Sequence, residues 1–454
     1  MSPSGNTRRL VVIGGVAAGM SAAARARRLD PELEIVVYER TGYLSYGSCG
    51  LPYFIAGVVR KATDLIARTP EQFGKQGIET HTHHEVTEVD TAAKMIKVRD
   101  LVEGRGFSVQ YDKLVIATGG RAIRPPIPGV DLEGVFVLRT VEDGLAVSRF
   151  MREEKPRRGV IVGGGYIGVE VAEAFRQRGL ETVLLNRPAQ LLNNFDPEIA
   201  QMMQTELERS GVTVSVDDAA VAIEGDATGR ARVVVTQRGR YETDLVLVGA
   251  GVRAEALLAG EAGVALGFKG AIAVDEGMHT SVPDVYAAGD CAETYHVLLQ
   301  GPSYVPLGTT ANKQGRAAGT NAAGGEEVFR GVVGTTVTKA FELGAAVTGL
   351  TEKAAIQSGL SPKAVTIEHG TRAHYYPSPG RIHVKLVWDP GNGRLLGAQI
   401  AGPVAEAKRI DVFATALHHD LTIEDLQRLD LGYAPPFAPV WDPILVAANV
   451  AAKS

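Results

Sequence analysis

GVIVGGGYIGVEVAEAF, residues 159–175, carries the clearest structural signal in this chain of 454 residues. A short apolar run typical of a buried strand enters three glycines in G-x-G-x-x-G spacing, and a run typical of a helix follows. In this arrangement the glycines allow a tight turn, a close approach of the backbone to a pyrophosphate, and close packing of helix on strand. The stretch therefore predicts a dinucleotide-binding unit built on Gly163, Gly165 and Gly168.

The strand predicted next, ETVLLN at residues 181–186, ends where such a unit holds its ribose. An acid at that point would bind a free 2′-hydroxyl, whereas an arginine accepts a 2′-phosphate. Here the strand ends in Asn186 and Arg187. Arg187 therefore favours NADPH as the nucleotide, with NADH as the alternative.

An earlier part of the chain repeats this order of elements. The apolar run at residues 10–13 enters GGVAAG, an alanine-rich helical run follows, and a second apolar run ends at Glu39. Gly14 suits the tight turn, Gly19 suits the packing of helix on strand, and Glu39 suits the ribose hydroxyl. Val16 replaces the middle glycine of the motif. The sequence thus predicts a second dinucleotide-binding unit with a less complete motif.

Two further strand-to-loop turns accompany the first unit. DKLVIATGG at residues 112–120 enters a turn at Thr118 and Gly119, and TSVPDVYAAGDCAE at residues 280–293 enters a turn at Gly289 and Asp290. Either turn found alone would be an ordinary connection. The order of all four motifs along the chain is what carries information about the fold.

The last third of the chain has a different pattern. Alternating residues at 382–388, a DPGNG turn and RLLGAQIAG predict an antiparallel hairpin. Residues 409–420 place Ile410, Phe413 and Leu417 on one helical face, and Asp442 with Pro443 suits the start of a final helix. The sequence therefore predicts an α+β unit with apolar surface left to bury.

Composition narrows the class of protein. The chain is 45% hydrophobic, carries 22% charged residues and has a net charge of -5, so it has no overall basic bias toward nucleic acid or an anionic membrane. We find no run of about 18 uncharged apolar residues that would span a membrane. With only two cysteines, a disulfide framework is excluded, and a reducing compartment, the cytoplasm, is expected.

The histidine-rich stretch HTHHE, residues 81–85, could suggest a metal site. Its residues alternate along a predicted strand, which would put His81 and His83 on the face opposite His84. Because metal ligands must converge on one point, we predict no metal site.

The four motifs in order resemble the FAD-dependent pyridine nucleotide-disulfide oxidoreductases over essentially the whole chain. The resemblance implies an α/β fold, with two Rossmann-like dinucleotide-binding domains and a C-terminal α+β domain that forms a homodimer. It implies an FAD-binding domain at residues 1–120 and 252–328, an NAD(P)H-binding domain at 121–251, and a dimerisation domain at 329–454. The implied FAD contacts are Gly14, Gly19, Glu39, Arg40, Thr118, Gly119, Gly289 and Asp290. The implied NAD(P)H contacts are Gly163, Gly165, Gly168 and Arg187.

A single cysteine, Cys49, lies in the stretch LSYGSCGLPYF after the first unit's ribose-binding acid. Many relatives pair two cysteines as C-x-x-x-x-C, but the positions five residues from Cys49 are Leu44 and Phe54. The other cysteine, Cys291, follows the predicted FAD contact and is interpreted as a packing residue. Cys49 is therefore expected to be oxidised to a mixed disulfide with a small thiol or to a sulfenic acid. A helix N-terminus and a nearby flavin are expected to lower its pKa.

SYGSCGLPY, together with GGVAAGM, RAHYYP and YAPPFAPVWDP, is similar to the coenzyme A-disulfide reductases and the NAD(P)H-dependent persulfide or polysulfide reductases. This similarity implies that Cys49 holds coenzyme A as a mixed disulfide. It implies catalytic roles for Tyr375 and Tyr433 of the partner subunit, with Tyr376 as an alternative to Tyr375. The implied substrate contacts are Ser21, Arg25, Arg28, Ser45 and Ser48.

Two positions bear on the choice of substrate. Oxidases of this family carry a histidine in the first glycine-rich turn, where this chain has Ala17. Some reductases carry a tail lysine near the coenzyme, where this chain has Trp441. We predict an enzyme that reduces coenzyme A disulfide, persulfide or polysulfide with NAD(P)H through FAD and Cys49. The alternative is an NAD(P)H oxidase that reduces oxygen through a Cys49 sulfenic acid.

Overall fold

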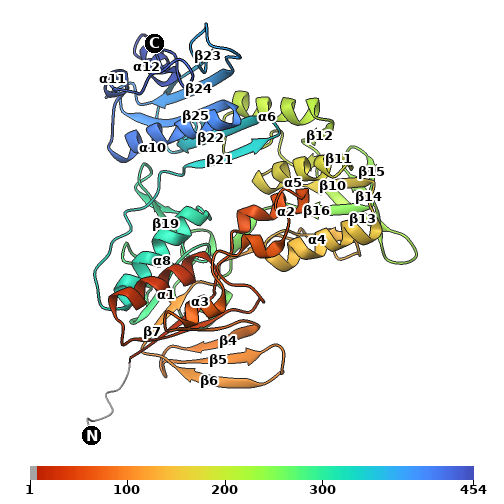
Figure 1. Cartoon of the computed structure of the whole chain (residues 1–454), viewed down its shortest axis with the longest axis vertical. Helices are drawn as coiled ribbons and strands as arrows, with labels where there is room; N and C mark the ends of the chain where they lie inside the picture. The colour runs from red at the N-terminus through yellow and green to blue at the C-terminus, as the bar shows by residue number, and fades with distance from the viewer. Residues whose placement is uncertain (1–7) are drawn as a thin grey trace.

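The computed structural model describes residues 8–454 and contains three five-stranded sheets within them. In Figure 1 the C-terminal unit lies at the top, the N-terminal unit at the lower left, and the unit between them in sequence at the right. Two of the sheets are parallel and the third is antiparallel. The predicted α/β fold, with two Rossmann-like units and a C-terminal α+β unit, is confirmed.

The first unit is a parallel sheet in the order β18-β7-β1-β2-β3. Helices α1 and α8 pack closely on each other, since a Cβ at Gly315 of α8 would lie 2.2 Å from the carbonyl oxygen of Ala18 in α1. The elements are β1 (Arg9–Ile13), α1 (Ala17–Leu29), β2 (Glu34–Tyr38), β3 (Ile78–His81), β7 (Lys113–Ile116), β18 (Val285–Ala287) and α8 (Gly308–Ala322).

Smaller elements surround this sheet. The chain crosses between the first and second units at the paired strands β8 (Gly120–Ala122) and β17 (Val252–Ala254), which lie at the two predicted boundaries of the NAD(P)H-binding domain. The other elements are η1 (Ser48–Gly50), α2 (Leu51–Ala56), η2 (Ala62–Leu65), α3 (Pro70–Gly74), β4 (His84–Asp90), β5 (Met95–Asp100), β6 (Gly106–Gln110), α7 (Leu257–Glu261), η3 (Phe268–Gly270), β19 (Thr294–His296) and β20 (Gly301–Ser303).

The second unit is a parallel sheet in the order β12-β11-β10-β16-β9, with a three-stranded antiparallel sheet, β13-β14-β15, attached to it. Residues 159–175 form most of β10, the glycine turn and nearly all of α5. The elements are β9 (Val135–Phe136), α4 (Val141–Glu154), β10 (Arg158–Val162), α5 (Tyr166–Gln177), β11 (Glu181–Asn186), α6 (Pro197–Arg209), β12 (Val212–Val216), β13 (Ala220–Gly225), β14 (Ala231–Thr236), β15 (Arg240–Glu242) and β16 (Leu245–Val248).

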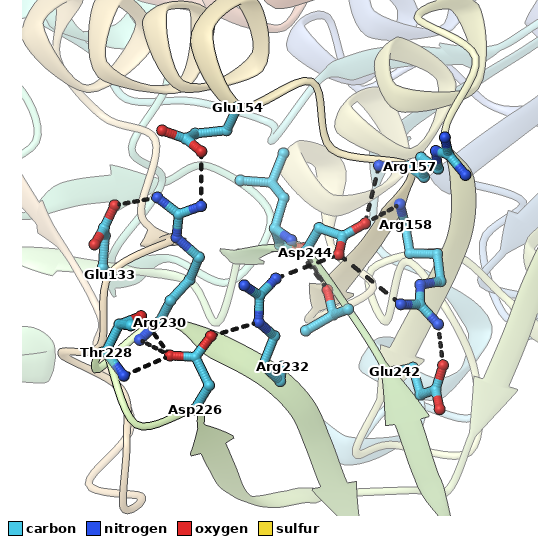
Figure 2. A network of polar contacts seen from close by, with 12 residues as sticks. Glu133, Glu154, Arg157, Arg158, Asp226, Thr228, Arg230, Arg232, Glu242 and Asp244 are labelled. Atoms are coloured by element: carbon cyan, nitrogen blue, oxygen red, sulfur yellow. Dashed lines mark hydrogen bonds and ion pairs between the residues drawn. The ribbon is translucent and has the colours of Figure 1, made fainter.

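A network of ion pairs joins the antiparallel sheet to the parallel sheet (Figure 2). Arg230 lies between two carboxylates, with nitrogen–oxygen distances of 2.8 Å to Glu133 and 2.6 Å to Glu154. Asp244 accepts hydrogen bonds from the backbone N–H groups of residues 157 and 158 and forms an ion pair with Arg232 at 3.6 Å. A cavity of about 180 Å³ lies here. Because arginines and acids alternate in this network, we interpret it as structural.

The C-terminal unit is an antiparallel sheet in the order β21-β22-β25-β24-β23. The predicted hairpin is confirmed as β24 and β25, and Ile410, Phe413 and Leu417 are buried on α10 as predicted. The elements are β21 (Thr336–Ala340), β22 (Leu343–Gly349), α9 (Glu352–Gln357), β23 (Lys363–Gly370), β24 (Arg381–Trp388), β25 (Leu395–Pro403), η4 (Val404–Arg409), α10 (Ile410–His418), α11 (Ile423–Gln427) and α12 (Pro443–Ala451).

The tail before α12 leaves large apolar side chains on the surface. Phe437 is 74% exposed, Val440 67% and Trp441 58%. Large apolar side chains that are exposed this close together in sequence favour a protein interface. The prediction that this unit has apolar surface left to bury is confirmed.

The core of the second unit continues into the C-terminal unit. One cluster of buried side chains combines Phe175 and Met203 of the second unit with Ala345 and Val347 of the antiparallel sheet. The same cluster includes Leu51 of α2, the short helix that follows Cys49. The second unit is therefore packed on both of its neighbours.

Candidate active site

The first glycine-rich turn has the backbone geometry that its sequence predicts. Gly14 has φ of +102°, and a Cβ there would lie 2.1 Å from the carbonyl oxygen of Ala117, so only glycine fits. A Cβ at Gly19 would lie 1.8 Å from the carbonyl oxygen of Gly14, which explains the close packing of α1 on β1. Val16 occupies the N-cap of α1. The turn keeps its shape although the middle glycine of the motif is absent.

Glu39 lies beside this turn at the end of β2. One carboxylate oxygen accepts a hydrogen bond from the N–H of Gly15 at 2.8 Å, and the other accepts from the N–H and hydroxyl of Thr41 at 2.9 and 2.8 Å. The residue is only 7% exposed. The next residue, Arg40, is exposed. The acid is therefore fixed where a Rossmann unit places the carboxylate that binds a ribose hydroxyl.

The two later turns come to the same edge of the sheet. Gly119 and Gly289 have φ of +73° and +83°, and Gly289 donates its N–H to the side chain of Gln314 at 2.8 Å. Asp290 accepts a hydrogen bond from Arg139 at 2.6 Å. Thr118 donates its hydroxyl to the carbonyl oxygen of residue 255. These turns follow the carboxyl ends of parallel strands, where dinucleotides bind in open α/β sheets, so the residues fit an FAD.

The second glycine-rich turn repeats this geometry. A Cβ at Gly163 would lie 2.3 Å from the carbonyl oxygen of Gly249, and one at Gly168 would lie 1.8 Å from that of Gly163. At Gly165 a Cβ would meet no heavy atom within 4 Å. The turn is therefore closed against the protein at its first and third glycines and open at its second, where a pyrophosphate approaches the backbone.

Asn186 takes the place in the second unit that Glu39 takes in the first. Its amide oxygen accepts a hydrogen bond from the N–H of Gly164 at 2.9 Å, and its amide nitrogen donates to the carbonyl oxygens of residues 188 and 190 at 3.0 and 2.7 Å. This residue holds the turn without placing a negative charge beside the ribose. Arg187 is exposed directly after it. The arrangement is compatible with a 2′-phosphate.

Cys49 lies in η1, one turn before α2, and is exposed. The protein raises the pKa of its thiol, chiefly through burial by surrounding atoms and then through the carboxylate of Glu170, while Arg139 and the hydroxyl of Ser48 act in the opposite direction. The expected lowering by the polypeptide is therefore wrong. The carboxylates of Glu170 and Asp290 both act against the lowering by Arg139, and the helix that follows Cys49 has only six residues.

Glu170 on α5 is a residue that the sequence analysis missed. Burial raises the pKa of its carboxyl to about 7, with a further contribution from Glu173. Thr338 of the C-terminal unit donates its hydroxyl to this carboxyl at 3.4 Å. It lies within residues 159–175, in the helical run after the glycine turn, where the motif itself does not single it out. Only the packing of α5 against α2 and β21 brings it close to Cys49.

A cavity of about 430 Å³ lies between the first glycine-rich turn and the segment before Cys49. Ser45, Tyr46 and Gly47 line one part of it, so the cavity reaches within two residues of Cys49 along the chain. Ser21 and Arg28 of the predicted substrate contacts also line it. Two other segments, which the sequence did not point to, also line the cavity, one through Ala67, Arg68 and Phe73 and the other through Asn312 and Arg316.

Arg25 differs from Arg28 although both lie on α1. Its guanidinium donates to the hydroxyl of Thr320 at 2.9 Å and forms an ion pair with Glu327 at 3.5 Å. It is not among the residues that line the cavity. The spacing that put both arginines on one helical face was insufficient, because Thr320 of α8 and Glu327, which follows that helix, contact Arg25 but not Arg28.

The structure brings together two of the predicted tyrosines. The hydroxyls of Tyr375 and Tyr433 are 3.2 Å apart, although 58 residues separate them in sequence. Both side chains are exposed, at 64% and 47% respectively. The hydrogen bond between Tyr433 and Tyr375 is the largest cause of a raised pKa at Tyr433. Tyr376 instead has its ring near the guanidinium of Arg372, which favours Tyr375 as the partner of Tyr433.

The histidine-rich stretch is not one strand. Strand β3 ends at His81 and β4 begins at His84, with His83 at φ of +56° between them. The rings of His81 and His84 lie 5.1 Å apart, so the expectation of opposite faces is wrong. Within residues 8–454 no group of three His, Cys, Asp or Glu side chains is placed to hold a metal ion. No helix in the same range is long and apolar enough to cross a membrane.

Known proteins with the same architecture were identified by sequence and structure. The pyridine nucleotide-disulphide oxidoreductase model matches residues 8–315, and the dimerisation domain of that family matches residues 335–443. An NAD(P)H coenzyme A polysulfide/persulfide reductase of Pyrococcus horikoshii is 42% identical over 98% of both chains. An NADH oxidase of Methanocaldococcus jannaschii is 36% identical over 98% of this chain and 99% of its own. The reduced CoADR-RHD of Bacillus anthracis superposes with a TM-score of 0.95 at 35% identity, covering 99% of this chain and 81% of that one.

Proposed function

The chain belongs to the pyridine nucleotide-disulphide oxidoreductase family, and from this premise we propose that it reduces coenzyme A disulfide, persulfide or polysulfide with NAD(P)H. The proposed catalyst is a homodimeric flavoprotein with one redox-active cysteine, Cys49. The proposed domains are those expected from the sequence, with FAD at residues 1–120 and 252–328, NAD(P)H at 121–251 and the subunit interface at 329–454. Its two free cysteines support a cytoplasmic location.

One observation carries the assignment of the substrate. The cavity beside Cys49 has the cations expected of a site for a phosphorylated thiol, because Arg28 and Arg68 line it and form no ion pair within residues 8–454, and Arg316, which pairs with Glu327 at 2.7 Å, also lines it. A small thiol alone would need no such cations. Ala17 also lines the cavity, at the position where oxidases of the family carry a histidine. The cavity therefore favours coenzyme A over the peroxide chemistry of the oxidases.

The residues around both glycine-rich turns fit the two nucleotides. Gly165 leaves space that a side chain would fill, and the carboxylate of Glu39 is fixed beside the first turn. Bound FAD would supply a two-electron connection between NAD(P)H and a sulfur. Asn186 and Arg187 support NADPH as the donor, because no carboxylate follows β11 to oppose a 2′-phosphate.

The proposed reaction balances with one NAD(P)H and one proton for each disulfide. The thiolate of Cys49 attacks one sulfur of the substrate, the substrate S–S bond breaks, and a new S–S bond joins Cys49 to one coenzyme A. The other coenzyme A leaves as a thiolate and takes a proton from Tyr433 or Tyr375. Two electrons from NAD(P)H then cleave the mixed disulfide, which releases the second thiol and restores the Cys49 thiolate.

Both tyrosines are proposed to act on the Cys49 of the partner subunit. They lie together on the exposed surface of the C-terminal unit, beside the apolar tail that we assign to the interface. Their 3.2 Å contact allows the Tyr433 hydroxyl to donate to Tyr375 and to stabilise a phenolate that forms on Tyr375. Ser48 supports the Cys49 thiolate by hydrogen bonding from within the same subunit.

A Cys49→Ser variant with Cys291→Ala as its control tests the proposal. Cys291 is fully buried and donates its S–H to backbone carbonyls, so it packs and does not react. The intact mass of the enzyme isolated without reductant should exceed that of the polypeptide by one coenzyme A, and the excess should disappear only in Cys49→Ser. Turnover of coenzyme A disulfide by Cys49→Ser at the rate of the unaltered enzyme would refute the mechanism. An unmodified or sulfenic Cys49 with oxygen as the one efficient acceptor would establish the oxidase instead.

A further inference from the structure

A buried lysine joins the second unit to the C-terminal unit. Lys385 lies on β24, next to the centre of the antiparallel sheet, and only 4% of its side chain is exposed. Its ammonium nitrogen lies 3.0 Å from a carboxylate oxygen of Asp196, 2.7 Å from one of Glu198 and 3.0 Å from one of Glu352. Asp196 and Glu198 belong to the second unit, whereas Lys385 and Glu352 belong to the C-terminal unit. A buried charge at a domain junction therefore has its partners on both sides.

The aspartate of this pair is held in a closed set of hydrogen bonds. Asp196 is the N-cap of α6, and its side chain is 3% exposed. The N–H of Asp196 donates to the amide oxygen of Gln399 at 2.7 Å, and the amide nitrogen of Gln399 donates back to the Asp196 carboxylate at 2.6 Å. The same carboxylate accepts the N–H of Glu352 at 3.1 Å. We call Lys385, Asp196, Gln399, Glu198 and Glu352 the junction cluster.

The junction cluster acts as a fixed connection. Burial lowers the pKa of Lys385, but the hydrogen bonds that it donates to three carboxylates outweigh burial and raise the pKa overall, so the lysine stays charged. Removing one member of a buried ion pair leaves the other charge without its partner, which destabilises the contact strongly. The carboxylate of Asp196 therefore keeps its hydrogen-bond and ion-pair partners only while α6 remains packed on β24 and β25.

The position of α6 is transmitted to the active site. Helices α5 and α6 contribute to the same buried cluster, and Leu51 and Ile55 of α2 pack into it. In Figure 1 α2 lies beside α5. Only Gly50 lies between Cys49 and the first residue of α2. Helix α5 starts at the glycine turn proposed to hold the NAD(P)H pyrophosphate. A shift of the second unit would therefore move that turn relative to the FAD-binding unit.

We propose that Lys385 is a positioning residue for the transfer of electrons from NAD(P)H to FAD. Its junction cluster holds the second unit against the C-terminal unit, so that the nicotinamide reaches the flavin in a reactive geometry. The proposal rests on the function proposed above, but only on the reduction of FAD by NAD(P)H and not on the reaction with a sulfur substrate. Reduction of the bound flavin by NAD(P)H is read without any sulfur substrate, so an error in the choice of sulfur substrate leaves this test unaffected.

Lys385→Met in the dimeric holoenzyme, with Lys408→Met as its control, tests the proposal. Lys408 lies in the same unit and pairs with Asp411, but its side chain is 75% exposed. For Lys385→Met we expect anaerobic flavin bleaching by NADPH to slow at least tenfold. The reaction of dithionite-reduced enzyme with coenzyme A disulfide should change less than twofold. Hydrogen exchange should rise at least tenfold in peptides that contain the first turn of α6. Lys408→Met should leave both rates and the hydrogen exchange of α6 within twofold of those of the unaltered enzyme.

Two outcomes would overturn the proposal. Flavin bleaching at the original rate, with or without faster exchange at α6, would show that the junction does not position the nucleotide. Equal slowing of both half-reactions would show a general loss of structure. Should Lys385→Met fail to fold, Lys385→Met combined with Asp196→Asn removes both charges together. We expect this variant to fold and to show the slow bleaching, and bleaching at the original rate would again refute the role of the pair.

Discussion

Replacing Arg28 by alanine should weaken the binding of coenzyme A disulfide about tenfold. Arg28 lines the cavity and, within residues 8–454, forms no ion pair, so its charge is free for a phosphate. Two unit charges 4 Å apart interact by about 1 kcal/mol in water and by about 4 kcal/mol at an effective dielectric constant of 20. Arg28 is exposed, so we place the loss near the lower limit, at about 1.4 kcal/mol, which corresponds to tenfold in affinity.

Arg25→Ala is the matched control for this experiment. Arg25 lies on the same helix one turn earlier, but Glu327 already neutralises it at 3.5 Å and it does not line the cavity. Its removal should change the KM for coenzyme A disulfide less than twofold. A persulfide without phosphates should be reduced equally well by both variants and by the unaltered enzyme.

The assay is the KM for coenzyme A disulfide at low and high ionic strength. Screening shortens the range of an exposed charge from about 10 Å at 0.1 M salt to about 3 Å at 1 M. The difference between Arg28→Ala and the unaltered enzyme should therefore shrink as salt is added. Equal KM values for Arg28→Ala and Arg25→Ala, or an Arg28→Ala effect that salt leaves unchanged, would refute the electrostatic reasoning.

Three further predictions follow from the site. Because the folded-state pKa of Glu170 is raised to about 7, its contribution to stability is complete below about pH 4.5 and is lost as pH rises toward 7. In denaturant titrations the free energy of unfolding of Glu170→Gln should therefore exceed that of the unaltered protein by up to about 3 kcal/mol at pH 8 and should equal it at pH 4. The same free energy of unfolding for both proteins at both pH values would contradict the raised pKa. Arg187→Ala should raise the KM for NADPH about tenfold and leave that for NADH within twofold, and equal changes for both nucleotides would refute its contact with a 2′-phosphate. Tyr433→Phe should slow thiol release about a hundredfold. A mixed dimer of one Tyr433→Phe subunit and one Cys49→Ser subunit should recover one working site, because that site combines an unaltered Cys49 with an unaltered Tyr433. No recovery would refute action across the interface.

Much of the fold followed from local sequence patterns. The two glycine motifs predicted β1 with α1 and β10 with α5, because a glycine with positive φ or a close helix–strand contact has few alternatives. The hairpin of β24 and β25 followed from alternation and a turn. The histidine-rich stretch failed, because one residue with positive φ breaks the strand at His83 and alternation says nothing about such a break.

The sequence by itself determined the parts of the site whose chemistry is local: the turns at Gly14 and Gly163, the acid Glu39, and a cysteine at residue 49 without a partner five residues away. Tertiary structure alone decided which distant groups meet. It paired Arg25 with Glu327 and left Arg28 free.

Tertiary structure also brings Glu170 close enough to Cys49 to raise the pKa of its thiol, and it pairs Lys385 with Asp196, 189 residues earlier in the chain. The reason is physical. Backbone geometry depends on a few neighbouring residues, whereas the desolvation and charge felt by a side chain depend on every segment that packs around it.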